Sequence, residues 1–214
     1  MEAIATQETI VAPHGKTGSR NGEARQNKRA IPLEERTDLT ISEVEALGIT
    51  EPYELIDGRI IFKMTKSKHA YIHGKFSSAL DFYLNEHPIG VLFLELSARL
   101  FPDDDRDLKT PDLGLYLNER LPEEDEFATA APDLAVEILT SDSGFLTLLD
   151  KADLYLSKGG KVVWIAIPAK SSVLIWTATE KRWEYETLTC PELLPGWSLD
   201  LKKFFKWPKP TAVK

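Results

Sequence analysis

DLAVEILT, the stretch at residues 133–140, is an apolar run with one carboxylate, Glu137, at its centre. A short apolar run of this kind is typical of a strand that is buried in a sheet. A buried carboxylate is costly unless a cation, a hydrogen-bond network or a metal ion compensates it. Glu137 therefore indicates a functional site, although an edge strand that exposes it to water, or a structural salt bridge, would also explain it.

The segments on either side of this run alternate between helix and strand patterns. Two segments, 67–86 and 145–158, repeat apolar residues three or four positions apart and predict helices. The apolar face of the first comprises His69, Ile72, Phe76, Leu80 and Tyr83. The other strand-like segments are 91–101, 111–117, 161–167, 172–178 and 182–188. We expect an α/β (α+β) domain with a central mixed sheet flanked by two main helices.

An N-terminal β-hairpin is predicted before the first long helix. YELI and RIIFKM flank Asp57-Gly58, a dipeptide that is typical of a two-residue hairpin turn. Upstream of the hairpin, Ser42 and Glu45 have the spacing of a capping box, which predicts a short capped helix.

The length of 214 residues suits one well-buried domain. Residues 1–37 are polar, contain glycines and basic residues, and show no periodicity, so we expect a disordered tail there. The domain is then expected at 38–207, followed by a C-terminal tail at 208–214.

The composition excludes several classes of protein. Hydrophobic residues make up 43% and charged residues 28% of the chain, as in soluble globular proteins. No apolar run approaches the roughly 18–20 residues that cross a bilayer. The net charge of −8 does not favour nucleic acid, so any such contact needs a local patch. The first residues lack the pattern of a secretory signal, and the single Cys190 cannot form an internal disulfide, so we expect a cytoplasmic protein.

A second carboxylate and a lysine support the interpretation of Glu137 as part of a functional site. Asp112 opens the strand-like segment 111–117, and if this strand neighbours 133–140, both acids project from one face and would need a divalent cation between them. Lys151 borders the buried face of the following helix and can reach outward. Taken separately, Asp112 could be part of a Pro-Asp turn, and Lys151 could be an ordinary surface lysine of a helix. Together the three suit phosphodiester hydrolysis, in which a metal polarises phosphoryl oxygens and a lysine stabilises charge or orients water.

A series of motifs resembles a known family. YELIDG, a helix that begins near KH, PDLGLYL, APDLAVEILTSDS, KADLYLSKGG, KVVWIAIPAKSSVLIW and PELLPGWSLDLKKFF follow one another in this order. The same ordered series is found in the putative restriction endonuclease family of Uma type, within the PD-(D/E)XK nuclease superfamily. The resemblance covers about residues 39–205, and the ordered series is far more specific than any one motif.

The resemblance implies a restriction-endonuclease-like fold and a Mg²⁺-dependent endonuclease, with Mn²⁺ as an alternative ion, that hydrolyses DNA phosphodiester bonds. Asp112 matches the PD aspartate, Glu137 the acid of the (D/E)XK motif, and Lys151 the lysine that similar proteins place on the next helix. Glu54 in YELIDG matches a glutamate that members often carry, which implies an additional catalytic acid in the site, although an ordinary polar residue of the hairpin would also explain it. By the same analogy, the Ile138 carbonyl is an additional metal ligand.

The sequence departs from the family pattern at three places. Leu139 stands where the common motif has its lysine. Thr140-Ser-Asp-Ser143 replaces the usual SPST, and Gly159-Gly160-Lys161 replaces the usual GVPE. These changes affect loops and leave both acids in place.

Local charge agrees with a nucleic-acid substrate. Five basic residues and no acid lie between Gly58 and Leu80, whereas residues 102–126 hold ten acidic and three basic residues. We predict nucleic-acid contacts at Lys63, Lys66, Lys68 and His69, although a solvated helix face would show the same pattern.

Other chemistries fit the sequence less well. His69 and His73 have a zinc-binding spacing, but they lack the glutamate of HExxH and a third ligand. The SKGGK stretch precedes a strand, the reverse of a phosphate loop, and Cys190 has no histidine nearby. Two rival functions stay open: a catalytically inactive nuclease-like scaffold that binds nucleic acid or a protein partner, and a dimeric structural module. A homodimer also suits the resemblance, because nucleases that cut both strands often pair.

Overall fold

The computed structural model describes residues 31–139 and 144–208. Most of the predicted N-terminal tail, nearly all of the predicted C-terminal tail and the departure at residues 140–143 lie outside the described residues. Along the chain the elements are η1 (Leu33–Glu35), α1 (Ile41–Ala46), β1 (Tyr53–Ile56), β2 (Arg59–Phe62), α2 (Ser67–Glu86), β3 (Gly90–Leu94), β4 (Leu113–Leu117), η2 (Asn118–Arg120), β5 (Leu134–Ile138), α3 (Phe145–Ser157), β6 (Val162–Ile167), β7 (Ser172–Thr177), β8 (Lys181–Glu184), β9 (Thr187–Cys190), β10 (Leu194–Asp200) and α4 (Leu201–Phe204).

The predicted N-terminal hairpin is present as β1 and β2, which pair antiparallel. Asp57 and Gly58 both have positive φ, 49° and 76°, as a two-residue type I′ turn requires. The hairpin and α1 share a small core, formed by Leu39, Ile41, Val44, Leu55, Ile60 and Leu108. Leu55 and Leu108 exchange two backbone hydrogen bonds of 3.0 and 2.9 Å. These bonds tie the hairpin to the segment that leads into β4.

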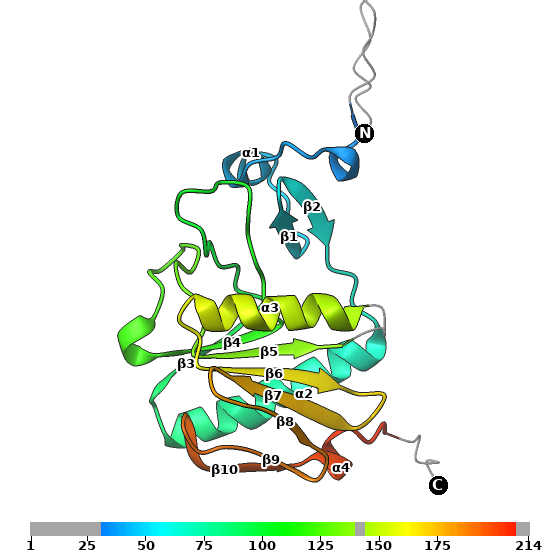
Figure 1. Ribbon diagram of the computed structural model, residues 1–214, viewed down its shortest axis with the longest axis vertical. Helices are drawn as coiled ribbons and strands as arrows, with labels where there is room; N and C mark the ends of the chain where they lie inside the picture. The colour runs from blue at the N-terminus through cyan, green and yellow to red at the C-terminus, as the bar shows by residue number, and fades with distance from the viewer. Residues whose placement is uncertain (1–30, 140–143, 209–214) are drawn as a thin grey trace, which may run out of the picture. The chain divides into compact units, whose positions relative to one another are not determined.

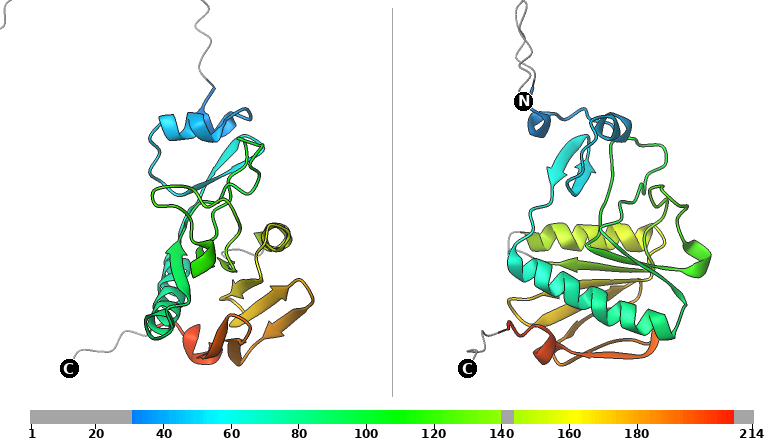
Figure 2. Two further views of the ribbon diagram at one scale, coloured as in Figure 1. Left: turned by 90° about the vertical axis from the view of Figure 1, so that its left-hand side faces the viewer. Right: turned by 180° about the vertical axis from the view of Figure 1, so that it is seen from behind.

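Six strands form the central sheet in the order β3-β4-β5-β6-β7-β8 (Figure 1). In this sheet β5 and β6 run parallel because α3 connects them as a crossover, and the other neighbours run antiparallel. Helix α3 covers one face of the sheet, and α2, the β9–β10 ribbon and α4 cover the other (Figure 2). The prediction of a mixed sheet flanked by helices is confirmed.

The alternation of side chains along β5 sets the direction of Glu137. Leu134, Val136 and Ile138 enter the core beneath α2, whereas Ala135 enters the core beneath α3. Glu137 has the parity of Ala135 and therefore faces α3. The predicted apolar face of α2 is also confirmed, because all five of its residues are buried.

Three local predictions are wrong. The capping box of α1 consists of Thr40 and Glu43, two residues earlier than predicted, because the helix already begins at Ile41. The predicted strand 91–101 ends at Leu94, because Glu95 adopts a φ of 52° that an extended strand cannot contain. The predicted strand 182–188 is divided into the end of β8 and the start of β9 by a bend.

None of the helices in residues 31–139 and 144–208 is long and apolar enough to cross a bilayer.

Candidate active site

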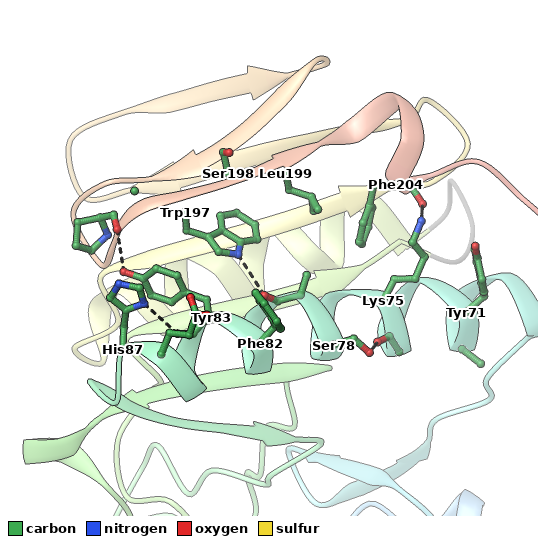
Figure 3. Close-up of a pocket in the computed structure, with 16 residues that line it drawn as sticks. Tyr71, Lys75, Ser78, Phe82, Tyr83, His87, Trp197, Ser198, Leu199 and Phe204 are labelled. Atoms are coloured by element: carbon green, nitrogen blue, oxygen red, sulfur yellow. Dashed lines mark hydrogen bonds between the residues drawn. The ribbon is translucent and has the colours of Figure 1, made fainter.

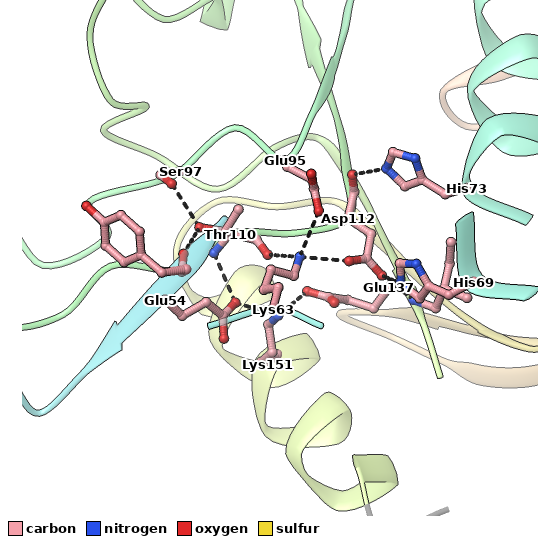
Figure 4. A network of polar contacts seen from close by, with 12 residues as sticks. Glu54, Lys63, His69, His73, Glu95, Ser97, Thr110, Asp112, Glu137 and Lys151 are labelled. Atoms are coloured by element: carbon pink, nitrogen blue, oxygen red, sulfur yellow. Dashed lines mark hydrogen bonds and ion pairs between the residues drawn. The ribbon is translucent and has the colours of Figure 1, made fainter. Parts of the chain in front are cut away.

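Glu54 reaches the central sheet because the hairpin docks against the segment before β4. Its Oε1 accepts a hydrogen bond of 3.1 Å from the Thr110 amide, and the Thr110 hydroxyl donates to the Tyr53 carbonyl at 2.9 Å. The Glu54 side chain is thereby buried and points toward α3 (Figure 4).

Asp112 lies next to the end of β5. Leu113, the first residue of β4, is the register partner of Val136, so Asp112, which comes directly before β4, lies beside Glu137 and Ile138. The Ile138 amide donates to Asp112 Oδ2 at 2.8 Å, and Oδ1 accepts from Lys63 Nζ at 2.7 Å. The expectation that the two segments are neighbouring strands is therefore met, and both carboxylates lie at the same end of them.

Glu137 and Lys151 form an ion pair inside the protein. Lys151 Nζ lies 2.5 Å from Glu137 Oε1 and 2.7 Å from Glu54 Oε1, so one ammonium joins two carboxylates (Figure 4). Glu137 is 2% and Lys151 8% exposed. The Tyr155 hydroxyl donates to the same Glu137 oxygen at 2.9 Å. Tyr155 was not predicted as a site residue, but its place one turn after Lys151 on the same helix face is the signal that would have found it.

Lys63 and Glu95 also belong to this group. Lys63 Nζ donates to the Thr110 carbonyl at 3.0 Å as well as to Asp112, and lies 4.0 Å from Glu95 Oε1. Lys63 was predicted only as a nucleic-acid contact, and Glu95 was not predicted at all. Glu95 is the one carboxylate within the apolar stretch 91–101, which is the same signal that pointed to Glu137.

The two histidines of α2 both contact Asp112. His69 Nε2 lies 3.0 Å from Asp112 Oδ2, and His73 Nε2 donates to the Asp112 carbonyl at 2.8 Å. His69, in the first turn of α2, thus belongs to the same group as the acids through its contact with Asp112. Lys66 and Lys68, the other predicted nucleic-acid contacts, are exposed, and Lys68 Nζ donates to the Pro168 carbonyl at 3.1 Å.

The carboxylates of the group differ in their proton affinity. Burial raises the pKa of Glu137 to about 7, against the opposing charge of Lys151. Burial acts in the same direction on Asp112, but the His69 hydrogen bond and the Lys63 charge outweigh it and hold the pKa of Asp112 well below its usual range. The Lys151 charge likewise lowers the pKa of Glu54 in spite of its burial. The two carboxylates beside Lys151 raise its own pKa, so the ammonium stays charged.

The donor atoms of this group fit a hard divalent cation. Mg²⁺ usually takes one or two carboxylates and keeps several waters, so it does not need a cage built wholly of side chains. Among the described residues, no three acidic, histidine or cysteine side chains are arranged to hold a metal ion by themselves, so the fit rests on the kind of donor atoms alone. Lys63 Nζ already occupies a position surrounded by a carboxylate, a carbonyl and a second carboxylate. A cationic group is therefore accommodated there by oxygen ligands alone.

A groove of about 1160 Å³ elsewhere on the protein lacks such chemistry (Figure 3). It lies between α2 and β10, and none of the clustered acids lines it. Its main polar atoms are satisfied internally: Trp197 Nε1 donates to the Ala79 carbonyl at 3.3 Å and the Tyr83 hydroxyl to the Pro195 carbonyl at 2.9 Å. The chemistry is concentrated at the carboxylate group instead.

The mixed sheet, the preceding hairpin and the acids gathered at the ends of β4 and β5 define a restriction-endonuclease-like protein. Residues 43–205 match the model of the Uma2 family, described as putative restriction endonuclease, and the chain belongs to this family.

A solved structure supports the same assignment. The crystal structure of a putative nuclease belonging to DUF820 from Anabaena variabilis ATCC 29413 superposes with a TM-score of 0.67 and 26% sequence identity. The match covers 78% of this chain and 97% of that one. No curated protein matches the sequence.

Proposed function

We propose that the protein is a metal-dependent endonuclease that hydrolyses phosphodiester bonds of DNA. One observation carries this proposal: Asp112, Glu137 and Lys151, which are distant in sequence, lie in one buried group together with Glu54. Family membership supports it, because the family is described as putative restriction endonuclease. The acids outnumber the lysines in this group, which is a costly arrangement for a purely structural one.

Asp112, Glu137 and the Ile138 carbonyl would hold the metal, Mg²⁺ or Mn²⁺. When bound, such an ion polarises a phosphoryl oxygen and lowers the pKa of the attacking water. The Ile138 amide fixes Asp112 Oδ2 through its 2.8 Å hydrogen bond, so this carboxylate is oriented before any ligand arrives.

Lys151 holds a proton and a positive charge next to the reacting position. Its Nζ is fixed by Glu54 and Glu137, which prevents the long side chain from sampling other rotamers. In this position it orients the attacking water or stabilises the charge that develops on the phosphate. Glu54 acts on Lys151 and on the Thr110 amide, so it positions the lysine.

The deciding experiment is a plasmid-nicking assay with Mg²⁺ or Mn²⁺. We expect wild type to convert supercoiled DNA to nicked circles, and Asp112→Asn and Glu137→Gln to lose this activity and metal binding measured by calorimetry. Asp153→Asn, an exposed acid on α3, is the matched control and should retain both. Nicking that survives both substitutions would refute the proposal.

An inactive nuclease-like scaffold is the second candidate. The observation that favours it is the internal pairing of the acids with Lys63 and Lys151, which neutralises much of their charge without a metal. Binding of DNA by wild type with no metal-dependent nicking would support the scaffold and exclude the endonuclease.

A further inference from the structure

Three aromatic side chains form a partly exposed stack at the edge of the central sheet. Phe145 at the start of α3 stacks on Trp183 of β8, and Trp183 stacks on Tyr185, with ring centroids 6.3 Å apart in both pairs. Trp183 is 39% and Tyr185 56% exposed. We call these three residues the aromatic platform. A core would hide such rings, so their exposure calls for another account.

The platform lies on the same face of the sheet as Glu137. Across the strands, Glu137 is the register partner of Ile165, Ile165 of Leu174, and Leu174 of Trp183. Partners in one row share a face, so Trp183 and Glu137 are in the same row, three strand spacings or about 14 Å apart. Ile165 and Leu174 in this row are buried beneath α3, so a strand of nucleic acid could reach Trp183 from the carboxylate group only past the end of β5, beside Leu139.

A small cavity of about 220 Å³ lies beside the platform. It is lined by Leu139, Phe145, Ile167, Lys170 and Trp183. Leu139 follows Ile138 directly, so the cavity begins where the carboxylate group ends. Its lining is apolar apart from Lys170, which suits the flat apolar face of a base and a nearby phosphate.

Cations lie on the platform face of β8. Lys181 and Trp183 alternate with Arg182 and Glu184, so this face of the strand carries a cation and an aromatic ring. The acids nearby are paired: Arg182 pairs with Glu184 at 3.1 Å and with Glu180, and Glu186 pairs with Lys202 at 2.7 Å. Lys68 adds a further cation, because its bond to the Pro168 carbonyl brings the start of α2 to the turn that carries Lys170.

We propose that the aromatic platform stacks unpaired bases of a nucleic-acid strand whose backbone passes the end of β5 beside Leu139, next to the carboxylate group. This inference rests on the proposed nuclease function and adds a substrate class to it: single-stranded or locally unpaired nucleic acid. In a duplex the faces of the bases are covered by their neighbours, whereas unpaired bases stack on exposed aromatic rings.

Binding of labelled oligothymidylate, followed by fluorescence anisotropy in EDTA, tests the platform without cleavage. We expect Trp183→Leu and Tyr185→Ala to weaken binding at least about 5-fold each, since the loss of one stacked ring costs that much or more. Trp183→Leu keeps an apolar side chain, and thermal melting checks that each variant is folded. Trp207→Ala is the matched control, because Trp207 is 48% exposed and meets Tyr71 edge-on, away from the platform. Its affinity should equal that of wild type.

The outcomes separate the platform from the proposed function. Unchanged oligothymidylate affinity in both platform variants, or equal losses for a duplex probe, overturns the platform even if nicking is observed. A platform-dependent affinity in Asp112→Asn supports the platform even if nicking fails. If light scattering shows that the variants only dissociate a dimer, with the affinity per subunit unchanged, the platform is a contact between copies and the proposal fails.

Discussion

Two buried carboxylates of the β5 segment, Asp133 and Glu137, have opposite electrostatic situations. Asp133 is 0% exposed, but its Oδ1 pairs with Arg120 at 2.7 Å and Lys161 at 3.0 Å, and its Oδ2 accepts from the Leu117 amide at 3.0 Å. These partners outweigh burial and lower the pKa of Asp133. One acid therefore has two cations, and its charge is fully compensated.

Glu137 shares the positive charge of Lys151 with a second acid, because Lys151 pairs with both Glu137 and Glu54. The nearby Asp112 has its own partners in Lys63 and His69. Burial and the Asp112 charge raise the pKa of Glu137, whereas two cations lower that of Asp133. Burial of a carboxylate is thus common to a structural and a candidate catalytic acid. The ratio of acids to cations distinguishes them: two cations pair with Asp133, whereas Glu137 and Glu54 share Lys151.

After the loss of Asp112 or Glu137, Lys151→Met should produce the largest effect on activity. Without its ammonium the group loses charge stabilisation at the reacting phosphate, and we expect nicking to fall by about 10³-fold, as for the loss of a preorganised donor. The matched variant is Lys161→Met at Asp133, which should leave nicking per folded molecule unchanged. Equal activity of Lys151→Met and wild type in the plasmid assay would remove Lys151 from the mechanism.

Asp133→Asn should produce the largest effect that is confined to stability. The substitution leaves Arg120 and Lys161 without their shared acid, and breaking a buried pair costs about 3 kcal/mol of unfolding free energy. Urea denaturation measures the loss, and nicking normalised to the folded fraction should stay at the wild-type level. A selective loss of nicking without a loss of stability would show that Asp133 is not merely structural.

The pH dependence of stability should differ between wild type and Glu137→Gln. Because the folded-state pKa of Glu137 is raised to about 7, the folded protein binds a proton that the unfolded chain has already lost above its usual pKa. Wild type should therefore lose stability as the pH rises from 5 to 8, by about 1–3 kcal/mol relative to Glu137→Gln, which mimics the protonated form. The pKa values of Asp112 and Glu54 are lowered, so those groups act below this window.

Chemical denaturation at a series of pH values without metal gives this difference directly. Asp133→Asn, compared with wild type over the same range, is the control, since the lowered pKa of Asp133 also lies below the window. Parallel pH profiles of wild type and Glu137→Gln would contradict the account of Glu137 given above.

The sequence predicted the elements whose signals are local. The apolar run at 133–140, the helix face of 67–86 and the Asp57-Gly58 turn each follow from a few neighbouring residues, and the structure contains all three. The gathering of Asp112, Glu137 and Lys151 was also predicted, because adjacent strands and a crossover helix bring such positions together. Their catalytic and metal-binding roles stay predictions.

The rest of the group depends on contacts between distant segments. Lys63 reaches Asp112 because the hairpin is fixed by the Leu55–Leu108 hydrogen bonds, and no local pattern reports that docking. Glu95 enters the group because its positive φ ends β3 early, a conformation that a non-glycine residue seldom adopts. The sequence analysis instead predicted Lys63 as a nucleic-acid contact and placed Glu95 inside a strand.

Tyr155→Phe should produce the smallest effect. It tests whether Tyr155 takes part in catalysis or only holds Glu137 in place. The hydroxyl donates to Glu137 at 2.9 Å, so its removal leaves Lys151 as the partner of this carboxylate among the described residues. We expect a loss of about 1 kcal/mol of stability, the value of one hydrogen bond, and a reduction of nicking by less than about 10-fold. Tyr116→Phe, which loses a hydroxyl bonded to the Ala130 carbonyl at 3.2 Å on the Asp133 side of the sheet, should cost similar stability and no activity. If Tyr155→Phe instead abolishes nicking like Lys151→Met, then Tyr155 belongs to the chemistry and Glu137 depends on two donors of equal importance.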